Sequence, residues 1–301
     1  MVIDDTALEF QMDARPRTPV WRLLARLAWR NPLGVLGAMI ILVLAFVALF
    51  ADFVAPYSPS STEFKAFIEP SADHLFGTDN LGRDVFSRVV HGARISLGVG
   101  VISVSIGSAA GAAVGIVSGY FGGRLDNLLQ RTGEIVMAFP ALILLLIIVS
   151  ILGPSIQNVV IAISLGVIPG VQRIVRGAVL SEKQNQYVEA ARALGAGNLH
   201  IMARHILPNV LALIIILATL LLGAAILIEA GLSFLQLGVP PPNPSWGADL
   251  SGEARTFFPD PPGAWWMAIF PGLAISITVL GFNLLGDTLR DILDPRLRGR
   301  L

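Results

Sequence analysis

The stretch GVLGAMIILVLAFVALF, residues 34 to 50, contains no charged or strongly polar side chain. An α-helix rises about 1.5 Å per residue and needs roughly 20 apolar residues to cross a hydrocarbon core of about 30 Å. With its neighbours, the stretch predicts a membrane span over about 33–54. It is longer than the apolar region of a secretory signal and no A-x-A cleavage site follows, so we interpret it as an anchored span.

Further apolar stretches predict five more spans, at about 95–118, 134–152, 157–175, 209–231 and 267–287. The chain is 54% hydrophobic and 14% charged, a composition typical of membrane proteins. In the fourth stretch Gly166, Pro169 and Gly170 predict a kink. Neighbouring helices or water would have to bond the backbone groups that the kink frees. The sequence therefore predicts an all-α polytopic membrane protein with six transmembrane helices.

The distribution of positive charge predicts the orientation of these spans. Five of the 21 Lys and Arg residues, Lys65, Arg83, Arg88, Arg94 and Arg255, fall on one side, and the rest fall on the side that carries both termini. The positive-inside rule then places both termini and the segment 173–208 in the cytoplasm. The net charge is zero and there are no cysteines, so the composition offers no basis for nucleic-acid binding, disulfides or thiolate metal sites.

A polar stretch, EAARALGAGNLHIMARHILPN at 189–209, separates two apolar runs. Helical periodicity puts apolar residues on one side of each half: Tyr187, Ala190 or Ala191, and Leu194 in the first, and Leu199, Met202 and Ile206 in the second. Gly195 and Gly197 can take positive φ, so we expect two short amphipathic helices joined by a sharp turn, with Pro208 opening the fifth span. Helices this short are unstable alone, so their apolar faces must pack on the bundle or headgroups, or in the groove of a soluble partner.

The pattern Glu189-Ala190-Ala191, three residues, Gly195, then nine residues and His205-Ile206-Leu207-Pro208 resembles the EAA loop of ABC-importer permeases. The form HILPN is similar to that of the dipeptide/oligopeptide/nickel permeases. Other stretches resemble the second of the two permease subunits of that family: HLFGTDNLGRDVFSRVVHGARISL at 74–97, GYFGGRLDNLLQR at 119–131, MAFP at 137–140, LSFLQLGVPPPNPSWG at 232–247 and LRDILDPRLR at 289–298. Gln236 stands where that family has Gly, which puts the backbone of its loop in question.

The resemblance implies a type I ABC importer permease fold with a cytoplasmic EAA-type coupling loop at 176–208. That loop would dock on an ATPase subunit through Tyr187, Glu189, Ala190, Ala191, Leu194, Gly195, Leu199, Met202, His205 and Pro208. The implied partners are a second, related permease, two cytoplasmic ATPase subunits, an extracytoplasmic solute-binding protein and the lipid bilayer. The implied solute is a dipeptide, an oligopeptide, or a related solute such as nickel or glutathione. The domains would be an N-terminal arm at 1–32, the six-span domain at 33–288 and a C-terminal tail at 289–301.

The sequence offers no catalytic or metal centre of its own. Neither lysine, Lys65 nor Lys183, belongs to a phosphate-binding G-x-x-x-x-G-K-[ST] loop, so we expect separate subunits to use ATP and Mg²⁺ and this chain to bind no cofactor and to be no enzyme. The four histidines have no metal-ligand spacing, and no G-x-S-x-G elbow occurs. A proton- or ion-coupled carrier remains the alternative, although ionisable groups near the middle of the membrane are scarce.

Two groups of polar residues carry weaker hypotheses. Thr219, Glu229 and Asn283 are candidates to line the translocation path, whereas Glu229 could instead reach the headgroups or cap a neighbouring loop. Outside, Asp79 or Asn80 is the expected N-cap of a helix leading into the second span. Asp79, Arg83, Asp84 and Arg88 would form its solvated face or take part in docking the binding protein. Trp246, Trp265 and Trp266, in the proline-rich segment 232–266, suit the membrane interface.

Overall fold

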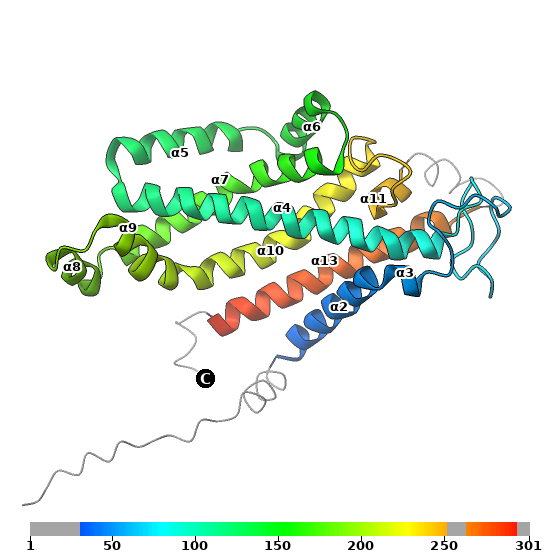
Figure 1. Ribbon diagram of the computed structural model, residues 1–301, viewed down its shortest axis with the longest axis horizontal. Coiled ribbons are helices and arrows are strands. Elements are labelled where there is room, and N and C mark those ends of the chain that lie inside the picture. The colour runs from blue at the N-terminus through cyan, green and yellow to red at the C-terminus, as the bar shows by residue number, and fades with distance from the viewer. Residues whose placement is uncertain (1–30, 252–262, 294–301) are drawn as a thin grey trace, which may run out of the picture. The chain divides into compact units, whose positions relative to one another are not determined.

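The computed structural model describes residues 31–251 and 263–293 (Figure 1). The chain divides into two units, Met1–Pro32 and Leu33–Leu301, and the fold described below is that of the second. Most of the expected N-terminal arm, the segment with Arg255 and the end of the tail lie outside the described residues. The described part is helical, without a β-strand.

Five helical runs in the described part are long and apolar enough to span a membrane. They are α2 (Pro32–Leu49), α4 (Val85–Phe121), α7 (Ile156–Glu182), the run Asn198–Phe234 that ends in α10 (Leu207–Phe234), and α13 (Trp266–Leu293). They correspond to five of the six expected spans. The second begins earlier than expected, since α4 starts at Val85 and continues as a single helix. The chain is therefore a multi-pass membrane protein.

The expected third span, 134–152, is broken. Its place is taken by α5 (Gly123–Met137) and α6 (Ala141–Leu152), which meet at an angle of 90°; counted as one bent span, they bring the number to six. Pro140 explains the break, because it lacks an N–H and disfavours helical geometry at Phe139. Figure 1 shows α5 beside α4 and α7, with α6 turning away. The expected third span is therefore bent at this proline.

Close packing of α4 on α7 forms the centre of the fold. Gly107, Gly111, Gly115 and Gly119 recur every four residues, and a Cβ at any of them would come within 3.0 Å of α7 atoms. The absent side chains allow the two backbones to approach, as small residues do between membrane helices. On α7, Pro169 lies inside one helix that continues through it.

The first helix is attached along one narrow face. Gly37 approaches the backbone oxygen of Gly281 on α13, where a Cβ would lie at 2.8 Å, and Gly34 lies against Thr288. The remaining surface of α2 is apolar and exposed, with Leu42 at 69% and Phe46 at 57%. Such a surface is suited to lipid.

The end of the bundle where α4 begins carries the loop 55–84, α3 (Ala51–Val54) and α11 (Trp246–Asp249); this is the end expected to lie outside. Trp246 and Trp266 are buried, and their indole N–H groups donate to Val89 O and Thr78 O, both at 2.9 Å. Placing these two at the membrane interface was therefore wrong, whereas Trp265 is 47% exposed. Gln236 has φ +62°, a left-handed conformation that a glycine would adopt without strain.

Candidate coupling site

The polar stretch begins with α8 (Gln186–Ala193), which ends in a sharp turn at Gly195. Gly195 has φ +82°, its N–H donates to Arg192 O at 3.0 Å, and the N–H of Ala196 donates to Ala191 O at 3.0 Å. This pair of bonds is a Schellman motif, which requires a residue that tolerates positive φ. The turn expected at Gly195 is confirmed. Gly197 does not share that role, because it has φ −67° and precedes α9.

The second half of the stretch is continuous with the fifth span. The short α9 (Asn198–Ile201) leads into a π-helical turn, η1 (Met202–Ile206), and then into α10. Pro208 is the second residue of α10, so it lies in the first turn of that helix as expected, although η1 continues directly into it. A π turn can absorb the loss of a backbone donor at proline. Asn209 Nδ2 donates to His205 O at 2.7 Å beside it.

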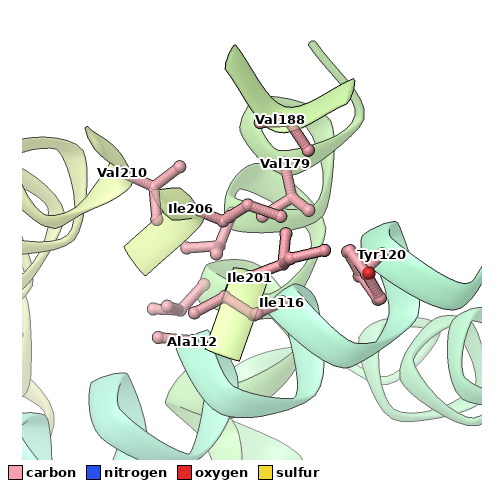
Figure 2. Packing of buried hydrophobic residues seen from close by; sticks show 10 residues of the cluster. Ala112, Ile116, Tyr120, Val179, Val188, Ile201, Ile206 and Val210 are labelled. Carbon is pink, nitrogen blue, oxygen red and sulfur yellow. The ribbon is translucent and has the colours of Figure 1, made fainter. Parts of the chain in front are cut away.

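Three side chains of this segment, Val188, Ile201 and Ile206, are fully buried. They pack in one cluster with Ile116 and Tyr120 of α4, Val175 and Val179 of α7, and Val210 of α10 (Figure 2). Residues 186–208 form a hook, and these three residues form its inner face. The bundle itself therefore receives one apolar face of the hook.

Polar contacts join the hook to the end of α4. Tyr120 Oη donates to Asn198 Oδ1 at 2.8 Å, and the Arg192 guanidinium lies 6.0 Å from the centre of the Tyr120 ring. Lys183 Nζ donates to Gly119 O at 3.0 Å and to Tyr120 O at 3.2 Å. The lysine thereby satisfies carbonyl groups left open at the end of the helix. The C-terminal end of α4 thus contacts both halves of the hook and the end of α7.

Tyr187 ties α8 to the beginning of α10. Its hydroxyl donates to Glu182 and accepts from Asn209 Nδ2 at 3.0 Å. Burial and the neighbouring Glu182 carboxylate raise the pKa of Tyr187 above its usual value, because both disfavour a phenolate. The hydroxyl therefore stays a donor at neutral pH.

The outer face of the hook is unpartnered within the described residues. Leu194 is 88% exposed and Leu199 is 77% exposed, and Glu189 and Ala190 are also exposed. Of the expected stripes, Ile206 is buried and Ala191 and Met202 are partly buried against the bundle, whereas Leu194 and Leu199 point outward. Val188, which belongs to neither stripe, is also buried. The hook therefore packs on the bundle through its inner face and exposes Leu194 and Leu199 on its outer face.

The charged residues at the start of α4 are structural. Asp84 is the N-cap of α4: it accepts from Ser87 N at 2.8 Å, and its Oδ1 lies 2.9 Å from His74 Nδ1. Asp79 accepts from Leu81 N at 2.9 Å and from Arg83 Nε at 2.5 Å. The expected N-cap at Asp79 or Asn80 was therefore wrong.

Arg88 connects two distant outer segments. Its Nε donates to Asp249 Oδ1 at 3.0 Å and its Nη1 donates to Pro59 O at 3.1 Å. Burial raises the pKa of Asp249, and the attraction of Arg88 opposes that rise. Asp79, Asp84 and Arg88 are buried and already bonded, so they do not form the solvated face expected of them. A cavity of about 470 Å³ adjoins Arg88, Asp249 and Ser233.

The candidate path residues do not lie together on one surface. Glu229 is fully buried, and its Oε1 accepts from Ser233 Oγ at 2.8 Å. Ser233 Oγ in turn accepts from Val239 N at 3.2 Å, so Glu229 supports a neighbouring loop and neither reaches the headgroups nor lines an open surface. Thr219 donates within its own helix to Ile215 O at 2.9 Å, and Asn283 is exposed beside Gly223. Within the described ranges, no group of three or more metal-ligating side chains gathers.

Comparison with known proteins agrees with this architecture. Residues 111–299 match the family described as binding-protein-dependent transport system inner membrane component, and residues 20–72 match the N-terminal transmembrane domain of oligopeptide transport permease C. The chain belongs to the first of these families, the membrane-embedded permease components of ABC importers.

Two relatives extend the similarity to nearly the whole chain. The chain is 43% identical to the dipeptide transport system permease protein DppC of Alkalihalophilus pseudofirmus, over 92% of this chain and 90% of that protein. It is 44% identical to the glutathione transport system permease protein GsiD of Escherichia coli, over 94% of this chain and 92% of that protein.

Proposed function

We propose that this chain forms half of the translocation path of an ATP-driven importer and that the hook transmits the motion of a separate ATPase to the spans. The observation that carries the proposal is the two-sided hook. Its inner face is locked into α4, α7 and α10, and its outer face exposes Leu194 and Leu199. Exposed apolar side chains of this size on a polar segment favour a protein groove as their environment.

The complete importer would contain a second, related permease, two ATPase subunits that use ATP and Mg²⁺, and an extracytoplasmic solute-binding protein. The excess of Lys and Arg in the termini and the hook segment supports a cytoplasmic location for both ends. The names of the two relatives favour a peptide-like solute, a dipeptide or glutathione. Asn283, which is exposed, remains our candidate to face the path.

The rigid connection of the hook to α4 suggests how motion would pass. A displacement of the ATPase that moves α9 must also move Tyr120. The Tyr120–Asn198 hydrogen bond and the close packing of the buried cluster hold the two residues together. Packed interfaces switch between discrete arrangements, so a small movement at the hook can repack α4 against α7.

The hook is tested by changing its outer face alone. Leu199→Asp places a charge where Leu199 is 77% exposed, so the permease should fold and insert while association with the ATPase and solute uptake are lost. Leu199→Met is the matched control and should retain both. Normal uptake by Leu199→Asp would refute the coupling role.

The energy source is tested on the reconstituted importer. Vanadate should abolish uptake, whereas dissipation of the proton gradient should leave it intact. The opposite pattern would identify a proton-coupled carrier.

A further inference from the structure

A polar groove of about 390 Å³ lies between α5 and the second half of α7, and the coupling role does not use it. Its walls carry three arginines, Arg131, Arg173 and Arg176, against one carboxylate, Glu134. The amide side chain of Asn127 also lines it. The groove is therefore positively charged and rich in donors.

Not all of these cations are committed to protein partners. Arg176 is held by Asp126, with Nε at 2.6 Å and Nη2 at 2.5 Å from its two carboxylate oxygens. Arg131 is mostly exposed and reaches Glu134 only at 3.9 Å, a weak surface pair. Arg173 is exposed and has no side-chain partner in the described part of the chain. Two guanidinium groups are thus available to an anion, and guanidinium binds phosphate oxygens in a bidentate manner.

Exposed apolar side chains follow the groove along the chain, across the bend into α6. Met137 lines the groove and is 41% exposed, and beyond it Phe139 and Ile143 are each 50% exposed. A small inorganic anion would use only the basic end of this surface. A molecule with an anionic head and apolar chains would cover both parts.

The groove also lies at a suitable depth. Arg173 and Arg176 precede the end of α7 at Glu182 by nine and six residues, or about 14 and 9 Å along the helix. With the proposed orientation, on which this inference rests, that end faces the cytoplasm. Basic pockets between membrane helices on that side attract anionic headgroups, because the cytoplasmic leaflet is negatively charged.

We propose that the groove between α5 and α7 binds the headgroup phosphate of an anionic phospholipid from the cytoplasmic leaflet. Arg173 and Arg131 hold the phosphate, and the acyl chains lie on Met137, Phe139 and Ile143. The lipid contacts both sides of the 90° bend between α5 and α6. It thereby supports a segment whose helical hydrogen bonding is interrupted at Pro140.

The experiment measures retained lipid on the complete importer. The importer is reconstituted in nanodiscs of phosphatidylcholine with phosphatidylglycerol, and bound phosphatidylglycerol is counted by native mass spectrometry after extraction. The double variant Arg131→Gln/Arg173→Gln should retain about tenfold less of it, since each arginine near the surface contributes to anionic-lipid binding. Arg124→Gln, an exposed arginine in the first turn of α5 outside the groove, is the matched control and should retain the parental amount.

Two further arms make the outcome decisive. Glu134→Gln removes the opposing carboxylate and should increase retention. Equal losses in the double variant and in Arg124→Gln would overturn the proposal, and so would displacement of the lipid by inorganic phosphate or by an acidic dipeptide, which would indicate a small-anion site. Leu199→Asp, which disrupts the hook, should retain the lipid, so failure of the coupling role and failure of the lipid site give different results.

Discussion

The hydroxyl of Tyr120 donates a 2.8 Å hydrogen bond to Asn198 Oδ1, which joins the last turn of α4 to the first residue of α9. The two residues are 78 positions apart in the chain. Through this bond, the spans reach the segment that we expect the ATPase to move.

Tyr120→Phe should therefore weaken coupling more than folding. The change removes one hydrogen bond, worth about 1 kcal/mol, and keeps the ring in its cluster. We expect more ATP hydrolysed per solute imported, measured with the reconstituted importer. Tyr57→Phe, which removes an exposed outer hydroxyl bonded to Asp73 O at 3.2 Å, is the control and should leave the ratio unchanged. An unaltered ratio in Tyr120→Phe would exclude this bond from transmission.

The two faces of the hook should respond differently to truncation. Ile201 is fully buried, so Ile201→Ala should lower stability by about 2 to 5 kcal/mol. Leu199→Ala changes a side chain that is 77% exposed and should alter stability by less than about 0.5 kcal/mol. Thermal unfolding of the purified permease distinguishes them. Similar losses of stability would show that Leu199 is buried as well, contrary to the structure.

Replacing a glycine of α4 by alanine should affect folding according to what that glycine faces. A Cβ at Gly115 would lie 2.7 Å from Gln172 O of α7, so Gly115→Ala should separate the helices and reduce the yield of folded protein. A Cβ at Gly98, on the same helix, would meet no neighbouring atom within 4 Å, so Gly98→Ala should be tolerated. Membrane yield and melting temperature measure both. Equal tolerance would contradict the close α4–α7 contact.

The outer ion pairs should also differ in strength. Arg88 and Asp249 are buried, so Arg88→Gln leaves a buried carboxylate without its partner and should cost about 3 kcal/mol or more. The pair of Arg94 with Asp52 is exposed, so Arg94→Gln should lower the melting temperature much less than Arg88→Gln. Melting temperatures in detergent give the comparison. A mild effect at Arg88 would mean that the outer segments do not depend on this contact.

Much of the fold could be predicted from local pattern. Apolar runs of sufficient length predicted five spans, because a backbone in lipid must satisfy its own hydrogen bonds and therefore forms a helix. Gly195 predicted its turn, because few residues tolerate positive φ. The break at Pro140 was missed, although the proline was visible, because the apolar run on its far side looked continuous with the rest. Val188 and Tyr120, which fix the hook, were missed because neither belongs to the periodic stripe that the sequence suggested.

By itself, the sequence determined that the chain crosses a membrane, where five of its spans lie, and that a polar segment with a sharp turn separates two spans, since these follow from hydropathy and backbone sterics of neighbouring residues. Only the tertiary structure decided that Asp79, Asp84 and Arg88 are internal supports, that Glu229 is enclosed, and which face of the hook remains free. The physical reason is that the burial of a polar or apolar side chain depends on partners distant in the chain, such as Asp249 for Arg88 and Tyr120 for Asn198.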